Sequence, residues 1–232
     1  MKIAIRNRTD VDRSYRAERA RALYNVIESQ GSEFDLDVDI PQIGGDDEWR
    51  IGVVVGPSGS GKSSIGRTLI EGGWIDWSAI SWGPGAVVSE CDDLASFEDV
   101  TAALASVGLG SVPAWLRPFH VLSNGEQFRA SLARLVLRIN GSYVVDEFTS
   151  VIDRRVARIG SAAFAKAWRR YGTGRVVFLT PHYDVLEWLQ PDWVLDLHQT
   201  VDYVAVEEYE AVTKIGTRTQ YETDPVIGAI ST

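Results

Sequence analysis

The sequence has a single cysteine, Cys91, and no uninterrupted apolar run long enough to cross a membrane. One cysteine cannot form an internal disulfide or a cysteine-rich zinc site, so neither secretion nor a structural metal is implied. A membrane helix needs about 20 consecutive apolar residues, and the opening stretch MKIAIRNRTD turns polar too early for a signal peptide. We therefore expect a cytoplasmic protein with no membrane segment of its own.

Basic residues are also in short supply, because 23 Lys and Arg stand against 32 Asp and Glu, for a net charge of -9. Affinity for nucleic acid comes mainly from neutralising phosphates with Lys and Arg, so the surface as a whole does not favour it. The run from Arg154 to Arg175 is a local exception with seven basic residues and no acidic one. It is typical of a solvated helix face, and contact with DNA is the alternative. Its basic residues are Arg154, Arg155, Arg158, Lys166, Arg169, Arg170 and Arg175.

Strand-like and helix-like patterns alternate along the 232 residues, which predicts an α/β core. Continuous Val, Ile and Leu runs are typical of strands buried on both faces of a parallel sheet, whereas FDLDVDI alternates and favours a half-exposed antiparallel strand. The expected strands cover 2–5, 34–40, 51–55, 143–145, 176–179 and 193–197. The expected helices cover 65–71, 126–139, 156–168 and 184–189.

Residues from about 77 to 120 lack a strand series and are rich in Gly, Pro, Ser and Ala, which indicates a short helical lobe inserted into the core. We expect one domain over 1–232. Within it, 1–48 form an N-terminal β region, 49–76 and 141–212 the core, 77–140 the inserted lobe, and 213–232 a loose tail.

The expected strand 51–55 leads directly into GPSGSGKS, a complete G-x-x-x-x-G-K-[ST] motif in its strand, loop and helix context. Glycines let the backbone wrap round phosphate oxygens, Lys62 reaches the outer phosphates, and Ser63 can bind Mg²⁺. The motif therefore predicts a nucleotide site. Its expected residues are Gly56, Pro57, Ser58, Gly59, Ser60, Gly61, Lys62, Ser63 and Ser64.

Four further motifs follow in order, and together they resemble those of ABC-type ATPases. LSNGEQ at 122–127 is similar to the signature LSGGQ, and YVVDE at 143–147 to the Walker B strand with its catalytic glutamate. SVID at 150–153 resembles the D-loop, and TPH at 180–182 the switch histidine. Three longer stretches resemble a branch of soluble ABC ATPases whose members occur alone or fused to a predicted acetyltransferase domain. They are WLRPFHVLSNGEQFRA, DEFTSVIDR and HYDVLEWLQPDWVLD.

Each of these later motifs also has an ordinary explanation when it is taken singly. Ser123 and Glu126 form the pattern of a helix capping box, a lone Asp-Glu after a strand is usually surface, and a lone His182 is more often structural. Their joint order behind a complete phosphate-binding loop favours the functional interpretation.

The resemblance implies a set of roles with ATP and Mg²⁺. Asp146, with Ser63, would hold the metal, Glu147 would polarise the attacking water, and His182 would sense the γ-phosphate beside the catalytic Lys62. The signature residues Ser123, Asn124, Gly125 and Glu126 would cover ATP bound to a second chain, and Asp153 would couple the two sites. Because the chain holds one copy of each motif, the expected assembly is a homodimer. Tyr24, or else Tyr15, is the expected adenine-stacking residue.

Two departures from transporter subunits bear on the biological role. No Gln stands where their Q-loop residue is expected, which leaves Ser89 or Glu90, and Phe148 replaces the proline after the Walker B glutamate. Only 123 − 62 = 61 positions separate Lys62 from Ser123, which is short for a lobe that docks a channel. We expect a non-transport ATPase acting on nucleic acid or a protein partner. The alternatives are a transporter's ATP-binding subunit and a nucleotide-gated binding module with little turnover.

Overall fold

The computed structural model describes residues 2–8, 12–24, 33–39, 49–69, 73–76, 81–138, 141–171, 174–197 and 204–205. The chain divides into two compact units, Met1–Ile40 and Pro41–Thr232. The expected tail over 213–232 lies outside the described residues. None of the helices within those described ranges is both long and apolar enough to cross a membrane.

The first unit contains the antiparallel element expected near the N-terminus. Strand β1 (Lys2–Arg8) pairs with β2 (Glu33–Asp39), and helix α1 (Tyr15–Tyr24) lies between them in the chain. The backbone register pairs Lys2 with Asp39 at one end and Arg8 with Glu33 at the other. β1 runs three residues beyond the expected end at Ile5. Pairing with β2 extends it, although the polar sequence RNR has no strand pattern of its own.

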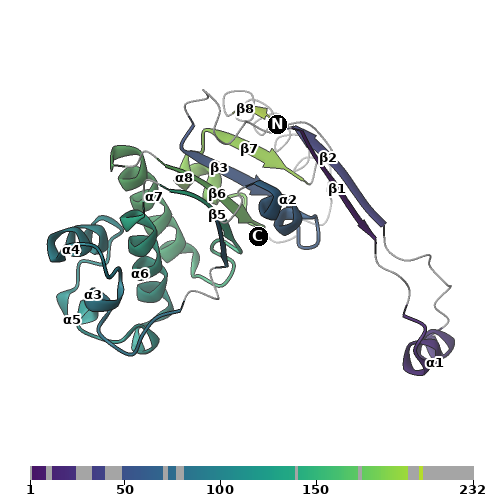
Figure 1. The fold of residues 1–232 in the computed structure, drawn as a ribbon, viewed down its shortest axis with the longest axis horizontal. Helices are drawn as coiled ribbons and strands as arrows, with labels where there is room; N and C mark the ends of the chain where they lie inside the picture. The colour runs from purple at the N-terminus through teal and green to yellow at the C-terminus, as the bar shows by residue number, and fades with distance from the viewer. Residues whose placement is uncertain are drawn as a thin grey trace, which may run out of the picture. The chain divides into compact units, whose positions relative to one another are not determined.

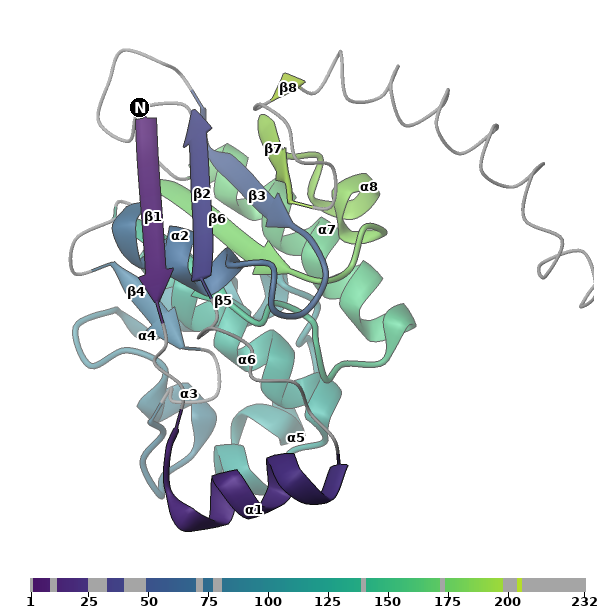
Figure 2. The ribbon, with the colours of Figure 1, turned by 90° about the vertical axis from the view of Figure 1, so that its right-hand side faces the viewer.

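The second unit contains a six-stranded sheet in the order β4-β5-β6-β3-β7-β8. All neighbouring pairs are parallel except β7 with β8, which is antiparallel. Figure 2 shows the arrows of β3 and β6 side by side and pointing the same way. The strands are β3 (Ile51–Val55), β4 (Trp74–Asp76), β5 (Ser142–Asp146), β6 (Arg175–Thr180), β7 (Trp193–Asp196) and β8 (Val204–Ala205).

Both faces of this sheet are covered, as the continuous apolar runs predict. Every residue of β3 is buried, and so are residues 176–180 of β6. Alternate side chains point to opposite faces of a strand. Val176 and Phe178 join the core cluster with α6 (Asn124–Leu137) and α7 (Arg154–Tyr171), whereas Leu179 packs close to Gly66 of α2 (Lys62–Leu69). In Figure 1, α6 and α7 lie side by side.

The inserted lobe is helical, as expected. It contains α3 (Val87–Glu90), α4 (Phe97–Ser106), α5 (Val112–Trp115), the short 3₁₀ turn η2 (Phe119–Val121) and α6. The helix α4 was not expected, although Ser96 caps it by accepting a hydrogen bond from the backbone N–H of Asp99. Figure 1 shows α3, α4 and α5 grouped beside α6 within the second unit.

Arg134 of α6 holds the beginning of the lobe. Its guanidinium donates to the carbonyl oxygens of Cys91, Ser81 and Glu90 at 2.9, 2.8 and 2.5 Å. It also lies over the ring of Trp82, 4.1 Å from the centroid. Because one planar cation satisfies three backbone carbonyls, α6 and the segment 81–91 are fixed to each other.

An aromatic cluster fills the space between α6, the sheet and α7. Phe148 has no exposed surface and lies 4.1 Å from Phe178 and 5.9 Å from Phe128, measured between ring centroids. Phe164 continues the cluster at 5.5 Å from Phe178 and 5.3 Å from Trp168. The residue that replaces the usual proline after Glu147 is therefore a core residue, and its burial anchors the turn that follows Asp146.

Candidate nucleotide-binding site

The phosphate-binding loop joins β3 to α2, and its backbone explains its glycines. Gly59 and Gly61 have φ angles of 82° and 89°, a left-handed conformation that other residues rarely adopt. At Gly56 a Cβ atom would come within 2.9 Å of both the Cβ of Leu197 and the Oγ of Ser60. The loop crest of Pro57, Ser58 and Gly59 is exposed, so its backbone is accessible to a ligand.

Lys62 begins α2 and is buried, with 7% of its surface exposed. Its Nζ donates to the carbonyl oxygens of Gly56 at 2.8 Å and Pro57 at 2.7 Å. Burial lowers the pKa of Lys62, and the nearby carboxylates of Glu147 and Asp146 act in the opposite direction. The ammonium group therefore lies under the loop and within electrostatic range of both acidic residues.

Ser63 and Asp146 meet at the carboxyl edge of the sheet. The Oγ of Ser63 donates to Oδ2 of Asp146 at 2.9 Å. Hydroxyl and carboxylate oxygens are ligands that Mg²⁺ accepts, and Mg²⁺ is usually bound by one or two protein groups together with substrate phosphates. No group of three or more His, Cys, Asp or Glu suited to a metal is found among the described residues. This donor set fits a nucleotide-borne Mg²⁺.

The turn after β5 is conformationally unusual. Glu147 and Thr149 have φ angles of 52° and 62°, which costs about 1–3 kcal/mol for each non-glycine residue. The hydroxyl of Ser150 donates to the carboxylate of Glu147, and the buried Thr149 accepts from Arg154 at 3.2 Å through its own hydroxyl. The surrounding contacts hold Glu147 at the exposed edge of the site.

Thr180 ties three of the motifs together. Its backbone oxygen accepts from the N–H of Gly56 at 3.3 Å, and its hydroxyl donates to the carbonyl of Phe148 at 2.9 Å. The same hydroxyl oxygen accepts from the backbone N–H of His182 at 3.1 Å. The phosphate-binding loop, the turn around Glu147 and the segment of His182 thus share one buried residue, the first through its backbone and the other two through its hydroxyl.

His182 lies close enough to these groups for its charge state to respond to them. Burial lowers the pKa of His182, and the neighbouring guanidinium of Arg154 lowers it further. The carboxylates of Asp184 and Glu147 act in the opposite direction. Glu147 follows β5, His182 follows β6 and Lys62 begins the helix after β3, so the three residues lie at the same edge of the parallel sheet.

The signature residues form the start of α6. Ser123 caps the helix in a complete capping box, in which Glu126 accepts from the backbone N–H and the hydroxyl of Ser123 at 2.9 and 2.8 Å. These hydrogen bonds hold the pKa of Glu126 below its usual value. Ser123 and Asn124 are exposed, whereas a Cβ at Gly125 would lie 3.0 Å from Val156 of α7. The ordinary interpretation of Ser123 and Glu126 as a cap is therefore correct, and it leaves a helix N-terminus facing outward.

The remaining candidates fall into structural positions that do not decide their roles. Asp153 is exposed and its Oδ1 accepts from the backbone N–H groups of Arg155 and Val156 at 2.9 and 3.3 Å, at the start of α7. Tyr24 and Tyr15 are 79% and 75% exposed on α1, in the unit Met1–Ile40. Their expected stacking on adenine stays a prediction.

The two Q-loop candidates differ in environment. Ser89 is exposed, and the Oε1 of Glu90 accepts from the backbone N–H of Gly85 at 3.1 Å. A Cβ at Gly83 would come within 2.1 Å of the carboxylate of Glu90, so that glycine leaves room for it. The backbone of Asp76, at the end of β4, pairs in register with Asp146. This strand was not expected from the sequence, because only three residues form it.

Arg154 is a functional candidate that the motifs do not mark. It donates to Asp184 through Nε at 2.9 Å and forms an ion pair with it through Nη2. Together with its bonds to Thr149, these contacts link the turn after Glu147 to the segment after His182. The sequence marks it only as the residue after Asp153 and as the first member of the basic run from Arg154 to Arg175.

The fold and this site define a P-loop nucleotide-binding core. No family model matches the sequence. The chain is 30% identical to the cytochrome c biogenesis ATP-binding export protein CcmA of Mesorhizobium japonicum, in an alignment of 137 residues that covers 47% of this chain and 67% of that protein. It belongs to the family of ABC-type ATP-binding cassettes.

Solved structures agree on the fold. CbiO1 from Clostridium perfringens, part of the ABC transporter complex cbiONQ, is 15% identical with a TM-score of 0.58, over 86% of this chain and 90% of that one. The dimeric structure of MJ0796, a bacterial ABC transporter cassette, is 14% identical with a TM-score of 0.54, over 74% and 90% of the two chains. The α/β fold of an ABC cassette is confirmed.

Proposed function

We propose that this chain binds and hydrolyses ATP with Mg²⁺ as a sandwich homodimer. The observation that carries the proposal is the position of Ser63, Asp146, Glu147 and His182 at one edge of the sheet, beside the buried Lys62. Each has the chemistry that one part of phosphoryl transfer to water requires.

The residues have distinct tasks in this proposal. Backbone N–H groups of the loop and the N-terminus of α2 bind phosphate oxygens, and Lys62 adds a positive charge. Ser63 and Asp146 hold Mg²⁺, which when bound neutralises charge on the phosphates. Glu147 accepts a proton from the attacking water, a contribution of about 10²- to 10⁴-fold in rate. Neutral His182 donates a hydrogen bond toward the terminal phosphate.

The second protomer completes the site. Ser123 and Asn124 are exposed at the N-terminus of an α6 that is 14 residues long, where the helix dipole favours an anion. The signature of one protomer covers ATP bound to the loop of the other, and Asp153 couples the two sites. A symmetric pair satisfies both protomers because each chain supplies one copy of every motif.

In this proposal the dimer uses ATP hydrolysis to change the conformation of a protein or nucleic-acid partner, and it does not drive a transport channel. The short separation of 61 positions between Lys62 and Ser123 supports this role. The sequence WLRPFHVLSNGEQFRA around the signature supports membership of the soluble branch found alone or fused to a predicted acetyltransferase domain.

A transporter's ATP-binding subunit is the second candidate, because the relatives reported above are named as an export protein and as transporter cassettes. Stable capture of a membrane permease by the Glu147→Gln variant with ATP would favour it. Capture of only water-soluble partners under the same conditions would favour the non-transport role.

Mixing two inactive variants tests the sandwich. Lys62→Ala removes the loop's charge, and Ser123→Arg places a bulky cation in the signature. Each variant alone is expected to lose hydrolysis. An equimolar mixture forms heterodimers with one intact composite site, so activity returns to at most about a quarter of the wild-type value. Full activity of Ser123→Arg alone would contradict the shared site.

A further inference from the structure

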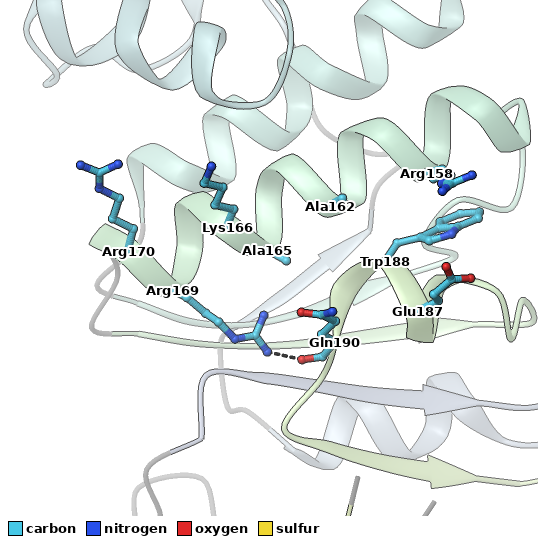
Figure 3. A pocket seen from close by; sticks show the side chains of 9 residues that line it. All are labelled: Arg158, Ala162, Ala165, Lys166, Arg169, Arg170, Glu187, Trp188 and Gln190. Carbon is cyan, nitrogen blue, oxygen red and sulfur yellow. Dashed lines mark hydrogen bonds between the residues drawn. The ribbon is translucent and has the colours of Figure 1, made fainter. Parts of the chain in front are cut away.

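A groove of about 690 Å³ lies between α7 and α8 (Val185–Leu189), along the basic run from Arg154 to Arg175. Figure 3 shows α7 along one side of it and α8 on the other. The residues that matter here are Arg158, Ala162, Lys166 and Arg170 on α7, and Glu187 and Trp188 on α8.

The α7 side of the groove carries a cationic stripe. Arg158, Lys166 and Arg170 are separated by eight and four residues, so they share one helix face. Arg158, Lys166 and Arg170 are exposed, and none of them forms an ion pair with an acidic side chain among the described residues. At 1.5 Å per residue the stripe is about 18 Å long.

Arg169 does not belong to this stripe, although it lines the same groove. It donates to the backbone oxygens of Leu189 and Gln190 and to Oδ1 of Asp192. Figure 3 shows it directed toward Gln190, whereas Lys166 and Arg170 point away from α8. Arg169 therefore fixes α8 to α7. The other three cations are exposed, and the guanidinium of Arg170 also lies over the ring of Tyr171, 5.1 Å from its centroid.

The floor of the groove is apolar. Ala162 and Ala165 contribute small side chains, and Trp188 contributes a half-buried indole. A basic stripe above an apolar floor matches a segment with acidic residues on one side and apolar residues on the other. Binding would bury apolar surface and pair the exposed cations at the same time.

We propose that this groove, which we call the α7–α8 groove, docks an acidic amphipathic segment of a protein partner. The inference rests on the proposed function in one respect, because it names the kind of partner on which the ATPase acts. Nucleic acid fits less well, because its phosphate backbone has no apolar side chains to pack against Ala162, Ala165 and Trp188.

Arg154 connects this groove to the nucleotide site. Its guanidinium lies over the ring of Trp188, 5.0 Å from the centroid. The same group binds Thr149, two residues after Glu147, and Asp184, two residues after His182. A segment that presses on Trp188 therefore acts on a side chain that holds both catalytic turns, so docking is expected to change the hydrolysis rate.

The test uses a fluorescein-labelled helical peptide of about 14 residues, with Glu on one face and Leu on the other, and measures its anisotropy with the full chain. We expect saturable, salt-sensitive binding that weakens at least tenfold in the double variant Arg158→Glu with Lys166→Glu. The double variant Arg16→Glu with Arg67→Glu changes the net charge equally at exposed sites elsewhere and is expected to bind like the wild type.

Two further arms separate the possible failures. Peptide binding is measured also with Lys62→Ala and no nucleotide, so a failure of the ATPase proposal leaves the docking result intact. A single-stranded thymidine oligonucleotide replaces the peptide in the last arm. No peptide binding, equal weakening by both double variants, or groove-dependent binding of the oligonucleotide alone would each overturn the inference.

Discussion

The Oγ of Ser63 lies 2.9 Å from Oδ2 of Asp146, although 83 positions separate the two residues in the chain. The parallel sheet creates this proximity. β3 and β5 both pair with β6, so the loop after β3 and the turn after β5 leave the sheet at the same edge. Carboxyl edges of parallel strands are where open α/β sheets bind ligands. The inserted lobe accounts for much of the sequence separation without moving either residue.

Lys62→Ala is expected to abolish ATP binding. Its ammonium is the side-chain cation buried under the phosphate-binding loop, 2.8 Å from the oxygen of Gly56. Titration calorimetry with ATP and Mg²⁺ measures the loss. Arg67→Ala, at an exposed position five residues further along α2, is the matched control and should bind normally. Unchanged affinity in the Lys62 variant would contradict the assignment of the loop.

Glu147→Gln is expected to retain ATP binding and to hydrolyse ATP about 10²- to 10⁴-fold more slowly, because the amide cannot take the proton of the attacking water. A coupled phosphate-release assay measures the rate. Ser150→Ala removes the hydroxyl that donates to Glu147 and should have a smaller effect. Wild-type turnover by the Gln variant would exclude Glu147 as the base.

Phe148→Ala is expected to destabilise the protein by about 3–5 kcal/mol. The side chain is fully buried between Phe128 and Phe178, so its removal leaves a cavity. Urea denaturation followed by circular dichroism gives the free energy of unfolding. Val151→Ala, at a position that is 83% exposed in the same segment, should change it little. A loss below about 1 kcal/mol for Phe148→Ala would contradict the packing described here.

Stability should depend on pH through His182. Burial and Arg154 lower the pKa of His182 in the folded state. Below the ordinary histidine pKa of about 6.5, the unfolded chain therefore binds a proton at His182 more readily than the folded chain does. The stability contribution is fully present above that pH and is lost as the pH falls through the folded pKa. The urea midpoint should therefore decrease more between about pH 7.5 and about pH 5.5 for the wild type than for His182→Asn. Equal falls would show that His182 does not contribute.

The sequence predicted those parts of the fold and site that have a local signature. The loop at Gly56–Ser63 combines a buried strand, glycines with positive φ and a helix start, and all three are local. The strand β4 carried no such signature, since a three-residue strand is specified by its pairing with β5 rather than by its own pattern. The helix α4 did carry one in its Ser96 cap, but the composition of the region masked it.

The roles of Thr180 and Arg154 could not be predicted, for a different reason. Each acts by joining segments that are distant in the chain: Thr180 contacts Gly56 and Phe148, and Arg154 contacts Asp184. Such contacts depend on tertiary structure and leave no periodicity or spacing in the sequence. Likewise, only the buried position of Phe148 explains why an aromatic residue stands after Glu147.

The mass of the Glu147→Gln variant in solution tests the central claim most directly. Light scattering with ATP and Mg²⁺ should give twice the chain mass of 25.6 kDa. The double variant Glu147→Gln with Ser123→Arg should have the mass of one chain, because its signature can no longer close over the nucleotide. A single-chain mass for Glu147→Gln at saturating ATP would contradict the sandwich dimer.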